Sequence, residues 1–386
     1  MALVNFTYEG IKTTISCLKE DKMKIICNKF TSKIQKNINS LYFVYDGNKI
    51  NYELTFYEQA NSSDRLRLEM NILVYKINGS NELIFPGIDY NLHNNFNVQF
   101  RLQYHKDTIL CATVLKDGRF ATCSADESII IYDNKTFKPD LIIKEHNGGI
   151  TYIFQLSTGM LATCSKDRTI KIFYIKNNNY DVFQILNNHK ESVNKIIELN
   201  NKKLVSCSAD SSVIFYSNNK DKYIQEFQIN TDKSCWCLIQ TKDNEICYYI
   251  SGGSIFFYKL IDKRIIKRID LFLIANGYNF MNMITKDLLL ITGEGKISII
   301  NVNKYNIVRT IHESDSVYIN VSCSLNKNII LTGDYVGTIK LWKLEDDNLK
   351  LISKKLKAHD KGIFALIKLN NGHILSGSVD RFIKIW

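Results

Sequence analysis

The sequence predicts a mainly β protein, a closed ring of seven four-stranded sheets preceded by a small α+β domain. Three observations predict it. Four segments repeat one pattern of polar and aromatic residues at fixed offsets. Residues 96–386 divide into seven units of about 42 residues, the length of four short strands with their turns. A segment that alternates apolar and polar residues lies just ahead of the first unit, where a closing strand belongs.

The four clear repeats share a histidine 21 residues before an aspartate, and an aromatic residue six residues after that aspartate. Two offsets kept in four copies are not chance, and a period of this length indicates a repeat fold. The pairs are His105–Asp126, His146–Asp167, His189–Asp210 and His359–Asp380, and the aromatic residues are Tyr132, Phe173, Tyr216 and Trp386.

Three weaker copies fill the interval between the third and the last clear repeat. Each keeps two apolar strands around a turn of Ser, Thr or Gly, but the polar pair is lost. The aspartate position holds Gly252, Glu294 and Val336, and the histidine position holds Thr231, Leu273 and Asp315.

The unit resembles the WD repeat, whose four antiparallel strands form one blade of a WD40 β-propeller. The resemblance implies that the histidine bonds the aspartate of a tight turn, and that a strand Ser or Thr and a strand Trp extend this network. The last repeat keeps the full set, which is His359, Ser376, Asp380 and Trp386. The resemblance therefore implies a seven-bladed WD40 propeller over residues 96–386.

His359, Ser376 and Asp380 are also the residue types of a catalytic triad. The same histidine and aspartate recur in three other repeats, with Thr122, Thr163 and Ser206 at the matching place. An enzyme needs one such site, whereas a repeated architecture needs one in every unit. The sequence holds no Gly-rich phosphate loop followed by Lys, and histidines spread around a ring do not converge on a metal. We therefore expect no catalysis, no cofactor and no metal.

The final repeat stops at Trp386 and so lacks its outermost strand. The segment Phe96–Gln103 alternates apolar and polar residues and is predicted to supply that strand. Its pairing with the last unit closes the ring and removes an open edge.

Residues 1–78 do not match the repeat. They predict two strands, a helix over about Lys22–Gln35 capped by Asp21, and two more strands. This order resembles a ubiquitin-like β-grasp domain, with residues 54–64 similar to the loop before the last strand, although other β-grasp interaction domains share the order. We therefore expect a β-grasp domain over 1–78, a linker over 79–95 and the propeller over 96–386.

The ubiquitin-like resemblance implies a docking module. Conjugated members of that family end in Gly-Gly, whereas here Lys76–Ser80 follows the last strand, so covalent transfer is not expected. By the same resemblance, Val44 and Leu73 fall where the family presents an apolar binding patch; the alternative is that they are ordinary core or surface residues.

In the WD family, exposed positions on one face lie three and five residues after the histidine and one before the aspartate. On the first three units these offsets give small or polar residues, and on the last four they give mainly large aromatic ones, which often anchor interfaces. We predict an arc of partner-binding residues there; the alternative is that these aromatics belong to the core. The first set is Thr108, Leu110, Ala125, Gly149, Thr151, Lys166, Ser192, Asn194 and Ala209, and the second is Trp236, Tyr278, Tyr318, Asn320, Tyr335 and Phe364.

The composition fits an intracellular protein. No run approaches about 18 apolar residues, and the 10 cysteines include no CxxC pair. We expect a cytoplasmic scaffold or adaptor that binds proteins or peptides, with a ubiquitin-pathway adaptor as one version; Tyr132-Asp133-Asn134-Lys135 faintly resembles the WDxR box of ligase adaptors. The alternative is a propeller that binds phosphoinositide or nucleic acid through its net charge of +11.

Overall fold

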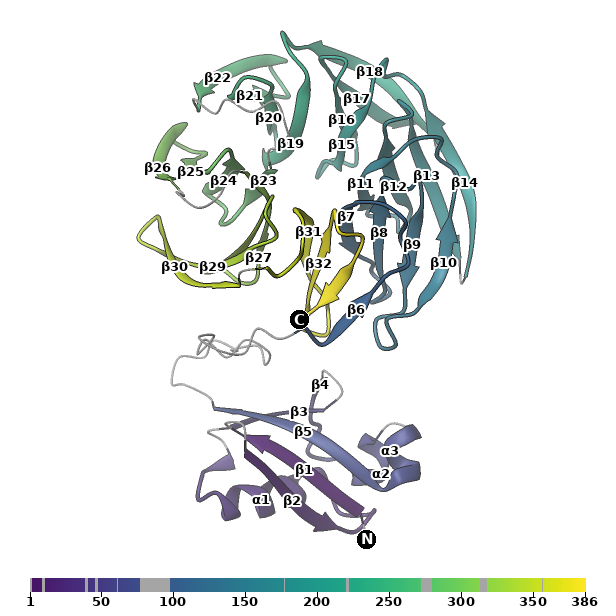
Figure 1. The fold of residues 1–386 in the computed structure, drawn as a ribbon, viewed down its shortest axis with the longest axis vertical. Helices are drawn as coiled ribbons and strands as arrows, with labels where there is room; N and C mark the ends of the chain where they lie inside the picture. Colours follow the sequence, from purple (N-terminus) through teal and green to yellow (C-terminus); the bar gives the residue numbers. More distant parts are fainter. Residues whose placement is uncertain are drawn as a thin grey trace. The chain divides into compact units, whose positions relative to one another are not determined.

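The computed structural model describes residues 2–8, 11–38, 41–45, 48–60, 62–76, 98–176, 178–219, 222–271, 280–312, 318–355 and 357–386. The chain divides into two compact units, Met1–Leu92 and His93–Trp386, which are drawn in Figure 1 and described separately. The predicted linker over residues 79–95 lies outside the described residues.

In its described residues, the first unit forms one five-stranded sheet in the order β2-β1-β5-β3-β4. Strands β1 and β5, which come first and last in the sequence of this unit, run parallel at the centre of the sheet. The other neighbouring strands are antiparallel. The strands are β1 (Ala2–Tyr8), β2 (Ile11–Cys17), β3 (Leu41–Tyr45), β4 (Asn48–Lys49) and β5 (Glu69–Lys76).

Helix α1 (Met23–Lys33) packs on this sheet through the apolar face that the sequence predicts. Met23, Ile26, Cys27 and Phe30 are all buried, at the spacing of one helical face. The Phe30 ring stacks on Phe6 of β1, with 4.4 Å between ring centroids. The core of this unit therefore lies between the helix and the sheet.

Two local predictions for the first unit were wrong. Asp21 does not cap α1: the helix begins after Lys22, and Asp21 accepts a hydrogen bond from the backbone N–H of Leu18 instead. The expected loop over 54–64 contains two short helices, α2 (Phe56–Gln59) and α3 (Ser62–Arg67). A capping box between Thr55 and Glu58, which sequence reasoning overlooked, starts α2.

In its described residues, the second unit forms seven four-stranded antiparallel sheets. We number them 1 to 7 in chain order. Sheet 1 is β7 (Ile109–Val114), β8 (Phe120–Ser124), β9 (Ile129–Tyr132) and β10 (Pro139–Ile143); sheet 2 is β11 (Ile150–Gln155), β12 (Leu161–Ser165), β13 (Ile170–Lys176) and β14 (Asn179–Leu186); sheet 3 is β15 (Val193–Glu198), β16 (Leu204–Ser208), β17 (Ser212–Asn219) and β18 (Lys222–Asn230).

The later sheets keep the same order of strands. Sheet 4 is β19 (Cys235–Lys242), β20 (Glu245–Ile250), β21 (Ser254–Lys259) and β22 (Arg264–Asp270); sheet 5 is β23 (Phe280–Met283), β24 (Leu288–Gly293), β25 (Lys296–Asn301) and β26 (Asn306–His312); sheet 6 is β27 (Ile319–Ser324), β28 (Ile329–Asp334), β29 (Ile339–Glu345) and β30 (Asn348–Lys355); sheet 7 is β31 (Ile363–Lys368), β32 (Ile374–Ser378), β33 (Ile383–Ile385) and β6 (Phe100–Leu102).

The seven sheets are arranged around a common centre. Each first strand contacts the first strand of the next sheet, from β7 through β31 and back to β7. Figure 1 shows these strands turned inward and the fourth strands at the periphery. Apolar clusters fill the spaces between neighbouring sheets: Phe173 packs between sheets 1 and 2, Trp342 between sheets 5 and 6, and Ile109 between sheets 7 and 1.

The predicted closing strand is present but short. Phe100, Arg101 and Leu102 of β6 pair with β33 of the last sheet, and the Gln99 N–H donates to the Ile385 carbonyl at 2.8 Å. Pairing of this segment with the last unit is confirmed for these residues, while Phe96 and Asn97 lie outside the described part of the chain. Sheet 7 is thus assembled from both ends of the second unit.

Deleting residues 96–103 should lower the free energy of unfolding by about 2–4 kcal/mol, because strand hydrogen bonds and the partial burial of Phe100 and Leu102 are lost. Urea denaturation followed by tryptophan fluorescence measures the change. Deleting residues 83–90 instead removes the same chain length and is the control. If the two deletions denature alike, β6 does not stabilise the ring.

Candidate functional site

Four of the sheets contain the same buried network of histidine, aspartate and hydroxyl. In sheet 7, His359 Nδ1 lies 2.8 Å from Asp380 Oδ2, and His359 Nε2 lies 2.8 Å from Ser376 Oγ. The Trp386 indole N–H donates to the same Ser376 oxygen at 2.8 Å. The indole, the imidazole and the carboxylate are therefore joined in one chain of hydrogen bonds.

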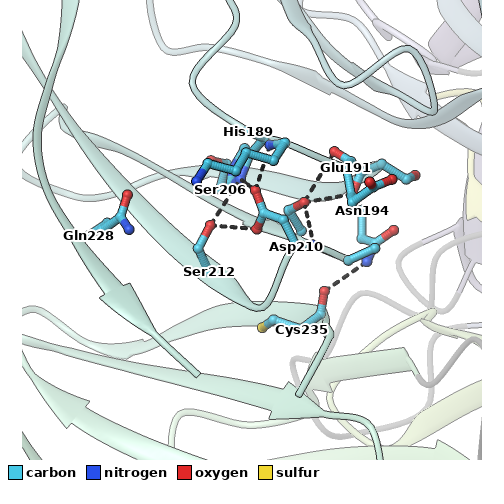
Figure 2. Close-up of polar contacts among 12 residues, drawn as sticks. His189, Glu191, Asn194, Ser206, Asp210, Ser212, Gln228 and Cys235 are labelled. Atoms are coloured by element: carbon cyan, nitrogen blue, oxygen red, sulfur yellow. Dashed lines mark hydrogen bonds and ion pairs between the residues drawn. The ribbon is translucent and has the colours of Figure 1, made fainter. Parts of the chain in front are cut away.

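The other three networks repeat this geometry. Figure 2 shows the one in sheet 3, where His189 bridges Asp210 at 2.9 Å and Ser206 at 2.7 Å. In sheet 1 His105 lies 3.1 Å from Asp126 and 2.7 Å from Thr122, and in sheet 2 His146 lies 2.7 Å from Asp167 and 2.8 Å from Thr163.

The aspartate in each network also closes a turn. Asp380 Oδ1 accepts the Phe382 N–H at 3.0 Å, and Asp380 Oδ2 accepts the Asp360 N–H at 3.1 Å. The intervening Arg381 has a φ of +71°, a conformation that the carboxylate's hydrogen bonds help to hold. One carboxylate thus joins the turn between the second and third strands to the loop that carries the histidine.

Burial and hydrogen bonding set the charges in the networks. Burial lowers the pKa values of His189 and His359, so their imidazoles favour the neutral form. Burial alone would raise the pKa of Asp380, but hydrogen bonds from His359 and from two backbone N–H groups outweigh it and lower the pKa to about 2. Burial is likewise outweighed at Asp126 and Asp167, where the pKa values of the carboxyls are lowered mainly by hydrogen bonds from their histidines and from the hydroxyls of Ser128 and Thr169.

The hydroxyl groups of the networks are out of reach of a substrate. Ser206, Ser376, Thr122 and Thr163 are all fully buried. A nucleophile must contact its substrate, and these oxygens contact only the protein. The arrangement is suited to holding strands together and not to covalent chemistry.

The sheets without this network use other contacts. In sheet 4 the buried Glu245 accepts hydrogen bonds from Thr241 at 2.6 Å and from the Tyr305 hydroxyl of sheet 5 at 2.5 Å. In sheet 6 the Trp342 indole donates to Thr332 at 2.9 Å, as Trp386 does to its serine. The sequence analysis did not single out Glu245, because one of its two partners, Tyr305, belongs to the next repeat.

Three of the predicted partner-binding residues gather on neighbouring parts of sheets 6 and 7. The Tyr318 and Tyr335 rings meet edge to face at 6.2 Å, and Tyr335 is 55% exposed. A Cβ atom on Gly362 would lie 3.0 Å from the Tyr335 carbonyl oxygen and 3.4 Å from the Phe364 ring, so this glycine separates the two residues. Lys166, on sheet 2, is exposed as well.

Asn320 was predicted to be an exposed partner-binding residue, and that prediction was wrong. Its side chain is 6% exposed and donates to the Ile363 carbonyl of the next sheet at 3.2 Å. Thr151 and Asn194, at the same offset in sheets 2 and 3, donate to Val193 and Cys235 in the same way. Their place on a first strand points them at the neighbouring sheet, and the recurrence of Asn and Thr was the overlooked signal.

The remaining predicted positions fall into two groups. Trp236 is half-buried, packs against the apolar cluster between sheets 4 and 5, and donates its indole N–H to Ser251 at 2.6 Å, so it has the core role that the sequence left as the alternative. Tyr278 lies outside the described residues. Val44 and Leu73 pair across β3 and β5, but their side chains are not among those described.

A protein-family model matches three segments of the second unit. The family model described as "WD domain, G-beta repeat" matches residues 96–133, 137–173 and 350–386. Three segments of the chain thus match WD40 repeats. It is also similar to the intraflagellar transport protein 122 homolog of Xenopus tropicalis, with 33% identity over 85 residues, or 21% of this chain. The matched segment spans only 7% of that relative, so the likeness covers a small part of its length.

The described residues contain neither a membrane-spanning helix nor a metal site, in the following sense. None of the helices among them has the length and apolar character needed to cross a membrane. Within the same residues, no three His, Cys, Asp or Glu side chains are grouped as a metal ion requires.

The histidine networks should make stability depend on pH. Unfolding exposes His359, which then takes up a proton at an ordinary pKa near 6.5, whereas the folded imidazole resists protonation. Stability should therefore be full above that value and fall as the pH drops below it, with a second loss as the pH falls from the ordinary Asp value of 3.8 toward 2 through Asp380.

His359→Gln should cost about 1–3 kcal/mol at pH 7.5 and should weaken the decline between pH 7.5 and pH 5. Urea denaturation at a series of pH values measures both effects. His312 is exposed, so His312→Gln is the matched control, and its free energy of unfolding should depend on pH as that of the parent does. Parallel pH profiles for the parent and His359→Gln would refute this account of the network.

Proposed function

We propose that the chain is a non-catalytic protein-binding scaffold, a seven-bladed WD40 propeller that holds a protein or peptide through Tyr318, Tyr335 and Phe364. The observation that carries the proposal is the exposure of Tyr335, whose ring meets that of Tyr318. Matches to WD repeats support a role in interaction, because proteins built from them generally act as scaffolds.

The aromatic group has the chemistry of an interface anchor. Large rings bring apolar area to a contact with few rotatable bonds, and the Tyr hydroxyls add hydrogen bonding. Val336, 48% exposed, extends the apolar surface next to Tyr335. Such a surface suits a partner that offers an apolar side chain within a polar surround.

For the first unit we propose a β-grasp domain that docks a second factor. The sheet order β2-β1-β5-β3-β4, with its parallel central pair and one helix packed on it, supports this interpretation. Val44 and Leu73 are the proposed contact positions, and their pairing across β3 and β5 puts them at one level of the sheet. An adaptor of the ubiquitin pathway is one version of a two-module scaffold.

Tyr335→Ala in the full chain should reduce capture of a partner at least about tenfold, while the thermal midpoint stays within about 1 °C of the parent. Affinity capture with quantitative mass spectrometry measures the first, and a thermal melt the second. Asn320→Ala is the matched control on the same sheet: it removes a hydrogen bond between sheets and should cost about 1 kcal/mol without changing capture.

The ionic strength of the capture separates the two candidate functions. An aromatic interface should hold its partner almost equally at low and at moderate salt, whereas an anionic surface held by the basic net charge should be released steeply. Capture that survives Tyr335→Ala but is lost in salt would favour the anionic-surface alternative. Unfolding of the Tyr335→Ala variant would mark that residue as part of the core.

A further inference from the structure

Seven residues at one level of the first strands form what we name the central layer. Each pairs with the penultimate residue of the second strand in its own sheet, so all seven occupy equivalent places around the ring. Their side chains are thiol, aromatic, aliphatic or methyl, with a single ammonium. The central layer consists of Cys111, Tyr152, Lys195, Cys237, Phe280, Val321 and Ala365.

Lys195 is the charged member of this layer and reaches three other sheets. Its Nζ lies 3.4 Å from Cys237 Sγ in sheet 4, and 5.3 Å and 5.4 Å from the ring centroids of Tyr152 in sheet 2 and Phe280 in sheet 5. The residue is only 7% exposed. Contacts to strands on both sides place the ammonium toward the common centre of the sheets.

The charge of Lys195 has no matching carboxylate among the residues described. The ion pairs that these residues form involve other side chains, and the ammonium's one hydrogen-bond acceptor is a sulfur atom. An ammonium has three N–H donors, and sulfur is a weak acceptor. The buried cation is therefore poorly satisfied.

The neighbouring groups favour a cation without neutralising it. Burial raises the pKa of the Cys237 thiol, so near neutral pH this sulfur carries no full negative charge. The faces of Tyr152 and Phe280 attract a cation through their ring quadrupoles. A desolvated charge held only by such contacts still lacks a counter-charge, which an anion would supply.

We propose that Lys195 is the centre of an anion-binding site, which takes one small oxyanion such as phosphate or a carboxylate near the axis of the ring. Tyr152 and Phe280 are half-buried and Lys195 keeps a small exposed area, so solvent contacts this level. The anion accepts the N–H groups that Cys237 leaves free, and the two rings flank the cation.

The test is a titration of the purified full chain with inorganic phosphate and, separately, with sodium acetate, at constant ionic strength. Isothermal calorimetry should show one saturable site, and the thermal midpoint should rise by about 2 °C or more at saturation. The two titrations distinguish a phosphate-selective site from one that accepts any oxyanion. Absence of saturable binding for both anions overturns the proposal without any variant.

Lys195→Met removes the charge and keeps an unbranched side chain that is one heavy atom shorter. In buffer free of oxyanions this variant should melt at or above the parent temperature, because replacing an uncompensated buried charge with an apolar group is neutral or stabilising. Its thermal midpoint should then not rise when phosphate is added. Lys190→Met, an exposed change near the same strand, is the matched control and should respond as the parent does.

Two results with these variants would contradict the site. An equal phosphate response in the parent and in Lys195→Met would show a general salt effect. A Lys195→Met variant that melts several degrees below the parent in oxyanion-free buffer would show that the ammonium is already satisfied within the protein. Neither result bears on the aromatic surface, because no partner is present in the titration.

Discussion

Closure of the ring is the constraint on which the second unit depends. Each four-stranded sheet is apolar on both faces and must be covered by a neighbour on each side. In an open row of sheets, the first and the last sheet would each leave one apolar face exposed. Strand β6, from the beginning of the unit, completes the sheet that the last residues begin. The apolar cluster between sheets 7 and 1 is then formed like those between the other sheets.

Within this ring, the histidine networks hold some sheets internally and other contacts hold the rest. The four networks join a loop, a strand and a turn of one sheet through one histidine–aspartate pair. The sheets without the aspartate keep ties to their neighbours, such as Glu245 with Tyr305 and Asn320 with Ile363, and sheets 2 and 3 have bonds of the same kind as the latter. Loss of the repeated residues has therefore not left the weaker sheets without polar contacts.

The same geometry separates structural residues from those available for recognition. Side chains on the first strands face a neighbouring sheet or the centre of the ring, as Asn320 and Lys195 do. The turns beyond the second strands carry the network aspartates, but they also present exposed side chains such as Lys166 and Tyr335.

The sequence by itself determined what recurs. Fixed offsets predicted a repeated unit, because equivalent residues recur at equivalent places, and the resemblance of that unit to the WD repeat implied the His–Asp contacts. Alternation of apolar and polar residues predicted strand β6. The apolar face of α1 followed from its spacing for the same reason. Tertiary structure alone decided what depends on contacts between repeats or on competing local bonds. Asn320 and Trp236 became structural because neighbouring sheets cover them, Asp21 bonded Leu18 in place of the helix, and Lys195 met Cys237 across 42 residues of chain. Contacts between different sheets depend on how the closed ring curves, and the sequence of a single repeat does not encode that curvature.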